Sequence, residues 1–300
     1  MEKELKTVSI DGLEEIGRGM TSRVYKLDED KVIKVFYPGI AVDEIEAERI
    51  ASRLAFIKDI PVAITYQLVR VSDGYGIIYE LVEADTLAST IGKAPELLSE
   101  YAIKSAKLLK KLHNTKYAEG ELPDIRQAWW RLCTIGLNKY ISEEESEKLQ
   151  KYLFIFPARN TFIHGDYHAF NILVRSDELI LIDVGDASLG HPIFDLASVY
   201  MANILIPKGA SEERRKQLIL SPEQFTCFYD VFISTYFDGD VDKKNRFTEV
   251  IKSLAALRLC ITHALIPGKD DDERIAFIRP KMEELLSLMD DIERKILNDF

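Results

Sequence analysis

Residues 6–83 follow the alternation of apolar and polar positions that is typical of β-strands. Short runs rich in β-branched and aromatic residues are separated by turn signals such as Asp11-Gly12 and the acidic stretch 28–31. We expect strands within 7–10, 13–17, 22–27, 31–36, 63–71 and 75–81. One stretch departs from this pattern: residues 41–57 place apolar side chains at helical spacing, with Asp43 as a candidate N-cap.

The rest of the chain is patterned mainly for helices. Residues 95–113 carry an apolar stripe at helical spacing. Capping boxes at Ser142 and Ser221 predict two further helix starts, and the aromatic stripe after Ser221 is expected to be core. Strand-like runs return only at 161–185. The pattern therefore predicts an α+β protein, with a small β-rich lobe that contains one helix and a larger, mainly helical lobe.

Composition narrows the class of protein. A net charge of −11 and a pI near 5.1 argue against a nucleic-acid partner, which would need a basic face. We expect no membrane partner, because no window has the roughly 18 apolar residues of a membrane helix, and no secretory signal. Three widely spaced cysteines fit reduced thiols in the cytoplasm. The sequence leaves open whether the protein is a monomer or a homodimer.

Gly17 and Gly19 lie between two predicted strands. A dinucleotide fingerprint would lead from a strand into a helix, whereas residues 23–27 are a predicted strand. A glycine loop between strands is the setting of the flap over ATP in kinases. The third glycine of that pattern is absent, so a backbone amide or the Ser22 hydroxyl is the candidate phosphate contact. The alternative is a plain hairpin turn, where glycine is common.

Lys34 stands inside the predicted strand 31–36, where lysine is uncommon. A lysine held there is useful if it meets phosphate oxygens and a carboxylate fixes its direction, as kinases do with a glutamate from the next helix. We prefer Glu48 as that partner, with Glu46 close behind. The alternative is that Lys34 extends along a sheet edge and the glutamates form a solvated helix face.

Asp166, Asn171 and Asp183 stand at the ends of short strand-like runs near the middle of the chain. A hairpin would bring Asn171 and Asp183 together, and two oxygen donors at a strand end suit Mg²⁺. Asp166, in the preceding loop, would orient an acceptor hydroxyl and accept its proton. Each residue alone is common in turns. The set, in this order along the chain, indicates phosphoryl transfer.

These motifs resemble the aminoglycoside phosphotransferase/choline kinase group of small-molecule kinases. HGDYHAFNIL (164–173) resembles the group's H-G-D-x-x-x-x-N-I-L motif. LIDVGDASLGHPIFDLA (181–197) resembles its second motif, in which Asp183 is a metal ligand and Asp195 is a structural carboxylate that supports the loop. H-G-D in place of the H-R-D of protein kinases favours the small-molecule group. The resemblance covers about residues 12–265.

The resemblance implies a two-lobed protein-kinase-like fold. Its antiparallel-sheet N-lobe would span 1–83, its hinge would lie near 80–86, and its C-lobe would span 84–300 with the catalytic and metal loops in 162–197. The Glu80 carbonyl and the Val82 amide would pair with the base of ATP, or of GTP. With Mg²⁺, the enzyme would move the γ-phosphate to a hydroxyl of a small molecule. By the same resemblance His164 is a scaffold residue, and we expect His168 and His191 to be structural or at the rim.

Composition does not decide the acceptor. Carboxylates would suit a polycation and aromatic faces would suit a quaternary ammonium. The region carries both kinds of residue: Asp186, Asp230, Asp238, Asp240, Trp129, Trp130, Tyr200 and Tyr229. We expect a small hydroxylated substrate, with cationic compounds among the candidates. An atypical protein kinase and a nucleotide-binding pseudokinase that serves as a regulatory module stay open as alternatives, although the presence of Lys34, Asp166 and Asp183 argues against the latter.

Overall fold

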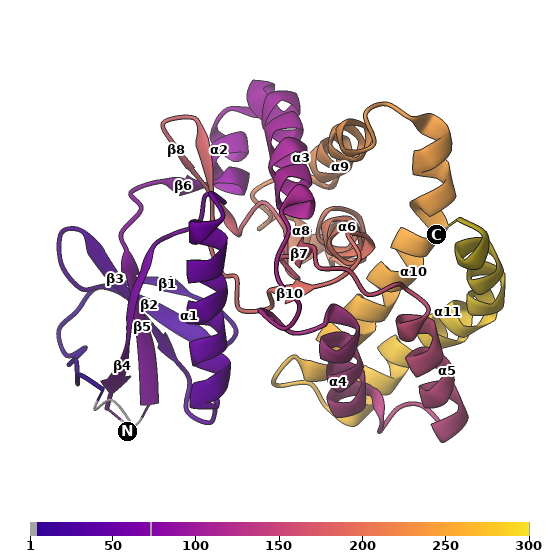
Figure 1. The fold of residues 1–300 in the computed structure, drawn as a ribbon, viewed down its shortest axis with the longest axis horizontal. Helices are drawn as coiled ribbons and strands as arrows, with labels where there is room; N and C mark the ends of the chain where they lie inside the picture. The colour runs from indigo at the N-terminus through magenta and orange to yellow at the C-terminus, as the bar shows by residue number, and fades with distance from the viewer. Residues whose placement is uncertain (1–4, 73, 300) are drawn as a thin grey trace. The chain divides into compact units, whose positions relative to one another are not determined.

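The computed structural model describes residues 5–72 and 74–299, and the chain forms two compact units. The first unit contains residues 1–90 and 169–186, and the second contains 91–168 and 187–300. Figure 1 shows that the first unit is rich in strands and that the second is mainly helical. Among the described residues, no helix has both the length and the apolar character needed to cross a bilayer.

The first unit is built on an antiparallel sheet of five strands in the order β1-β2-β3-β5-β4. Its strands are β1 (Glu15–Arg18), β2 (Ser22–Lys26), β3 (Lys31–Phe36), β4 (Thr65–Val71) and β5 (Gly74–Glu80). Helix α1 (Val42–Ile57) packs on β4 and β5, and its Ile45 joins Phe36 and Ile77 in one cluster. Ile33 belongs to a different cluster with Val69. Because strand residues alternate between faces, Lys34 shares the face of Phe36 that α1 covers.

Two local predictions were wrong. Residues 7–10 form no strand, because this segment pairs with β4 only around Arg70, through the Val8 N–H and the Lys6 carbonyl. Asp43 is not the N-cap of α1. Ala41 takes that position without a side-chain hydrogen bond, and Asp43 lies in the first turn, where its charge favours the helix dipole.

A three-stranded sheet completes the first unit. It contains β6 (Asp85–Thr86), β8 (Ile172–Arg175) and β9 (Glu178–Leu181), in the order β6-β8-β9. The Leu181 amide donates to the Pro61 carbonyl, and the Ala63 amide donates to Leu181. The division therefore differs from the predicted boundary at residues 83 and 84, because backbone hydrogen bonds attach residues 84–90 and the hairpin 169–186 to the first unit.

The second unit is helical. Helix α3 (Leu98–Asn114) packs on α9 (Pro222–Tyr236), and α10 (Val241–Leu265) packs on α4 (Ile125–Leu137), α6 (Ile193–Tyr200) and α11 (Asp271–Asp299). The remaining elements of the second unit are η1 (Pro95–Leu97), α5 (Glu143–Phe154), β7 (Phe162–Ile163), β10 (Ser188–Leu189), the π-helical turn η2 (Met201–Leu205), α7 (Ile206–Gly209) and α8 (Glu212–Arg215). Helix α2 (Leu87–Lys93) begins in the first unit and ends in the second.

The sequence signals for helix starts and core hold in the second unit. Both predicted capping boxes are present, at Ser142 before α5 and at Ser221 before α9. The aromatic stripe of α9 supplies Phe225, Phe228 and Phe232 to the core, as expected. Burial of such a face contributes the main stabilisation of a helix in a protein of this kind.

Gly190 provides a test of close packing in the second unit. A Cβ at this position would clash with Ile125 Cγ2, far inside van der Waals contact. We expect Gly190→Ala to lower the free energy of unfolding by about 1–3 kcal/mol through overpacking. Urea unfolding of Gly190→Ala, Ile125→Ala and the double variant measures the coupling, which should make the double variant more stable than the sum of the single effects predicts. Strict additivity would contradict this account.

Candidate active site

Lys34 is held between two carboxylates in the first unit. Its Nζ donates to Glu48 Oε1 and to Asp183 Oδ1, each at 2.7 Å. Burial lowers the pKa of Lys34, but the charges of Glu48 and Asp183 outweigh it, so the pKa lies above its ordinary value. The lysine's helical partner is Glu48, because Glu46 instead pairs with Arg49. A cation fixed in this way keeps both its charge and its direction.

Glu48 is itself fixed by its neighbours. The Tyr79 hydroxyl donates to Glu48 Oε1 at 2.7 Å, and burial, together with Glu48, raises the pKa of Tyr79 well above its ordinary value. A Cβ at Gly185 would lie 2.8 Å from Glu48 Oε2, so the glycine leaves room for this carboxylate. The buried charge thus has a cation, a hydroxyl donor and a fitted cavity, as buried charges require.

Asn171 and Asp183 flank one end of the β8–β9 hairpin. Ile172 pairs with Leu181, and the Ile182 amide donates to the Asn171 carbonyl at 3.0 Å, so the predicted hairpin is confirmed. Asp183 has a φ of 59°, a left-handed conformation that non-glycine residues adopt at some cost. Within the described residues there is no group of three His, Cys, Asp or Glu side chains suited to a metal. A Mg²⁺ ion shared with phosphates needs only one or two protein oxygens.

The glycine stretch lies in the β1–β2 hairpin, as predicted. Gly17 is in β1, and the Gly19 amide donates to the Ser22 carbonyl at 2.9 Å. A Cβ at either glycine would meet only ordinary van der Waals contacts, so packing alone does not require glycine there. Without side chains at these positions, a ligand can approach the backbone closely. Ser22 starts β2 and is only 4% exposed, and the Gly19 amide is used within the turn. The tip amides of Met20 and Thr21 are therefore better placed than the Ser22 hydroxyl to meet a phosphate.

In the described part of the chain, the predicted hinge contains backbone amides that make no backbone hydrogen bond, and that of Val82 is one of them. The Glu80 amide donates to the Ile64 carbonyl, and the Leu81 amide donates to Asp30. The Val82 amide makes no backbone hydrogen bond within residues 5–72 and 74–299, although Val82 is buried. It belongs to an apolar cluster with Ala63 and Ile180, against which Leu173 and Ile182 pack. An amide that has no backbone partner among the described residues and lies beside an apolar surface suits the edge and face of a nucleotide base.

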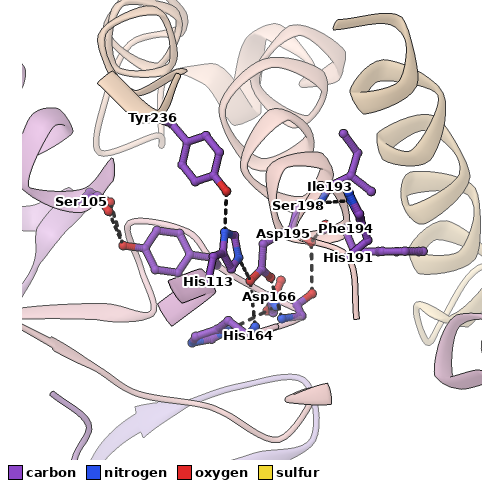
Figure 2. Close-up of polar contacts among 12 residues, drawn as sticks. Ser105, His113, His164, Asp166, His191, Ile193, Phe194, Asp195, Ser198 and Tyr236 are labelled. Carbon is purple, nitrogen blue, oxygen red and sulfur yellow. Dashed lines mark hydrogen bonds and ion pairs between the residues drawn. The ribbon is translucent and has the colours of Figure 1, made fainter. Parts of the chain in front are cut away.

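In the second unit, Asp195 holds the loop that carries Asp166 (Figure 2). The amides of His164 and Gly165 donate to its two oxygens, each at 2.8 Å, and His113 Nε2 lies 3.0 Å from Oδ2. Gly165 has a φ of 84°, which explains glycine at this position. The expectation that Asp195 supports this loop is confirmed. His164 is fully buried and its Nδ1 accepts from the Asp166 amide, as a scaffold residue would.

Asp166 is a strongly acidic carboxyl. Burial alone would raise its pKa, but His168 and, more weakly, Arg258 and His164 bring the pKa down to about 2. His168 Nε2 lies 3.3 Å from Asp166 Oδ2. Asp166 is therefore ionised at neutral pH and can accept a hydrogen bond from a hydroxyl.

Several candidate acceptor residues have structural contacts. Trp129 is 2% exposed and its ring packs on Phe194 with centroids 4.9 Å apart, which favours packing over a cation cage. Asp238 pairs with Lys110, and Asp240 caps α10. These contacts reduce the set of carboxylates available for a polycation.

The sequence patterns missed four contributors to these arrangements. His113 and His168 contact the carboxylates Asp195 and Asp166, and the sequence patterns do not indicate these two contacts. Tyr79 and Gly185 shape the surroundings of Glu48. For His168 and Gly185, the one sequence feature that could have indicated a role is their closeness to the motif residues. His168 lies within the catalytic motif, and Gly185 follows Asp183 by two residues.

A sheet lysine paired with a helical glutamate, together with an H-G-D loop in a helical unit, defines the class of protein-kinase-like phosphotransferases. The chain belongs to the phosphotransferase enzyme family, whose model matches residues 12–222. The predicted family and phosphotransferase activity are therefore confirmed. A search of curated proteins gave no match.

Solved structures confirm the kinase-like fold. A choline/ethanolamine kinase family protein from Mesorhizobium loti aligns with a TM-score of 0.62 and 14% identity, over 95% of this chain and 91% of its own. The aminoglycoside phosphotransferase APH(2'')-Ib, bound to ADP, aligns with a TM-score of 0.60 and 17% identity, over 93% of this chain and 94% of its own. The amicoumacin kinase hAmiN, in complex with AMP-PNP, Ca²⁺ and Ami, aligns with a TM-score of 0.62 and 14% identity, over 94% of this chain and 90% of its own.

The Lys34–Glu48 pair gives a stability prediction. Glu48→Gln keeps the acceptor for Tyr79 but removes the charge opposite a buried lysine, so we expect the free energy of unfolding to fall by about 1–3 kcal/mol. Glu46→Gln makes the same charge change in the same helix, at a more exposed pair, and should cost less than about 1 kcal/mol. Chemical denaturation at pH 7 compares the two, and equal losses would contradict the assignment.

Asp166 gives a prediction of pH dependence. Its pKa is lower in the folded chain, near 2, than the ordinary value of 3.8, so its contribution to stability is present above pH 4 and is lost as the pH falls toward 2. We expect the difference in unfolding free energy between wild type and Asp166→Asn to shrink over this window. A difference that does not change between pH 6 and pH 2.5 would contradict the prediction.

Proposed function

We propose that this protein transfers the γ-phosphate of ATP or GTP, with Mg²⁺, to a hydroxyl of a small molecule. The observation that carries the proposal is the fixed cation Lys34, held by Glu48 and Asp183 beside the hairpin end where Asn171 lies. Phosphoryl transfer depends mainly on positioning and charge neutralisation, and this arrangement supplies both.

The residues of the first unit fit a nucleotide. The Val82 amide and the apolar cluster around it would hold the base, and the tip amides near Gly19 would meet phosphate oxygens. Lys34 would bind phosphate oxygens, while Asp183 and Asn171 would hold Mg²⁺ through their oxygens. When bound, the nucleotide supplies the phosphoryl group and the metal ion neutralises its charge. Base recognition through backbone atoms is compatible with ATP and with GTP, and related structures contain ADP, AMP-PNP or GDP.

Asp166 would orient the acceptor hydroxyl. A carboxylate whose pKa is about 2 is a weak base, so it would accept the proton only once the attacking oxygen has become strongly acidic during transfer. Its main contribution is then to hold the hydroxyl in position, and His168 helps to keep the carboxylate ionised.

A small-molecule acceptor is supported by the H-G-D motif and by the related structures, which include a choline/ethanolamine kinase family protein and aminoglycoside phosphotransferases. Lys34, Asp166 and Asp183 are all present, which argues against an inactive regulatory module. A protein acceptor is an alternative outcome of the test below.

The test is a screen for nucleoside diphosphate release over a panel of hydroxylated amino sugars, amino alcohols, sugars, amino acids and one generic protein substrate, with ATP or GTP. We expect one small-molecule class to be turned over. Asp166→Asn should lower transfer by about 10²–10⁴-fold while nucleotide–Mg²⁺ binding is retained. Asp183→Asn should weaken Mg²⁺-dependent nucleotide binding.

The control for the metal assignment is Asp177→Asn, which makes the same charge change at the opposite end of the β8–β9 hairpin. It should leave metal and nucleotide binding unchanged. Wild-type turnover by Asp166→Asn would remove Asp166 from the reaction, and an unchanged Mg²⁺ titration in Asp183→Asn would remove that residue from the metal site. Turnover of the protein substrate alone would replace the small-molecule proposal.

A further inference from the structure

A cavity of about 330 Å³ opens within the second unit, and its lining includes His113, whose imidazole contacts Asp195. Its walls come from α3, α9, the start of α10 and the segment around His191. Of the residues considered above for the nucleotide, the metal ion or the acceptor, the cavity lining contains Asp238, whose carboxylate pairs with Lys110.

The cavity is cationic in an acidic protein. Lys110, Arg159 and Lys243 line it, against the single carboxylate Asp238, whereas the whole chain carries a net charge of −11. Lys110 pairs with Asp238, and Lys243 lies on the exposed first turn of α10. The pKa of His191 is lowered to about 3, mainly by burial and to a smaller extent by the nearby Arg159 and His113. This imidazole is therefore neutral. Such a concentration of positive charge attracts anions.

One wall of the cavity is aromatic. The rings of Phe237 and Phe247 are nearly parallel, at 2° with centroids 6.0 Å apart, and Tyr236 meets Phe237 edge to face. The volume is at the lower end of the range for small-molecule pockets and has room for a ring as well as an anionic group. Flat apolar groups pack well on such faces.

We propose that this cavity binds a small organic anion, a phosphate or carboxylate group attached to a flat apolar body, and that its binding stabilises the loop that carries Asp166. The anionic group would lie toward Lys243 and Arg159, and the apolar body would lie against the phenylalanine rings. Binding of the anion does not depend on the phosphotransferase reaction. The anion would regulate that reaction only if the loop with Asp166 is catalytic, which rests on the proposed function.

A chain of hydrogen bonds leads from the cavity wall to the loop (Figure 2). The pKa of Tyr236 is raised, chiefly by burial, so it remains a phenol, and its hydroxyl lies 2.7 Å from His113 Nδ1. His113 Nε2 donates to Asp195, because a carboxylate can only accept. Asp195 in turn accepts the amides of His164 and Gly165. A ligand that orders Tyr236 therefore biases a network that ends at the loop backbone.

The binding test is calorimetric titration of the full chain with phenyl phosphate, benzoate, inorganic phosphate and phenol at constant ionic strength. We expect phenyl phosphate or benzoate to bind at least about tenfold more tightly than inorganic phosphate and phenol, since only they combine charge and ring. The tighter of the two identifies the anionic group. Failure of both to bind at 10 mM, a concentration on the order of weak-ligand affinities, would overturn the proposal.

Charge variants locate the site. Lys243→Glu should weaken binding by at least about tenfold. Lys244→Glu is the matched control, with the same charge change at the next residue of the same helix but outside the cavity lining, and it should change affinity less than about twofold. Lys34→Met should also have no effect, which excludes binding at the nucleotide residues. Equal losses in Lys243→Glu and Lys244→Glu would reduce the effect to general electrostatics and overturn the site.

Hydrogen exchange tests the link to the loop without any turnover. Bound ligand should slow exchange in the peptide 162–168 of the wild type. Tyr236→Phe keeps the ring but removes the hydroxyl, so it should retain ligand binding within about threefold and lose this protection. Unchanged exchange in the ligand-bound wild type, or equal protection in Tyr236→Phe, would overturn transmission through His113 and Asp195.

Discussion

The buried carboxylate of Asp195 is the interaction on which the loop bearing Asp166 depends. A charge with no solvent contact costs several kcal/mol unless donors surround it. Here the donors are the amides of His164 and Gly165 and the imidazole of His113. Satisfying this one group therefore fixes two consecutive residues of the loop backbone, and the conformation of Asp166 follows from theirs.

In the first unit, a buried cation is likewise stabilised by the polar groups around it. Lys34 is buried in a strand, where an unpaired ammonium would lose its proton or leave the core. Glu48 and Asp183 keep it charged, and Tyr79 and Gly185 hold Glu48 in place. The lysine is thus positioned by an ion-pair network built from β3, α1, β5 and the segment after β9. Each polar group in this network satisfies the charge or the hydrogen-bonding capacity of another, so the loss of one group affects the others.

Local patterns were informative wherever the physical cause was local. Capping boxes at Ser142 and Ser221, the apolar alternation of β3 and the H-G-D spacing all depend on neighbours within a few residues. The boundaries of the two units, in contrast, depend on contacts between residues far apart in the chain. Backbone hydrogen bonds from Leu181 to the segment around Pro61 attach the hairpin 169–186 to the first unit, and nothing within the hairpin's own sequence indicates such a distant partner.

By itself, the sequence determined the element types, the family motifs and the residue types needed for phosphoryl transfer, because these follow from composition and spacing along one segment. It also ordered the two candidate partners of Lys34, preferring Glu48 to Glu46. Only the tertiary structure decided which carboxylate the lysine meets, that His113 supports Asp195 and His168 contacts Asp166, and that cationic side chains from α3, α10 and the segment before β7 meet in one cavity. These are contacts between side chains far apart in the chain, and their geometry is set by how helices and sheets pack, which no single stretch of sequence encodes.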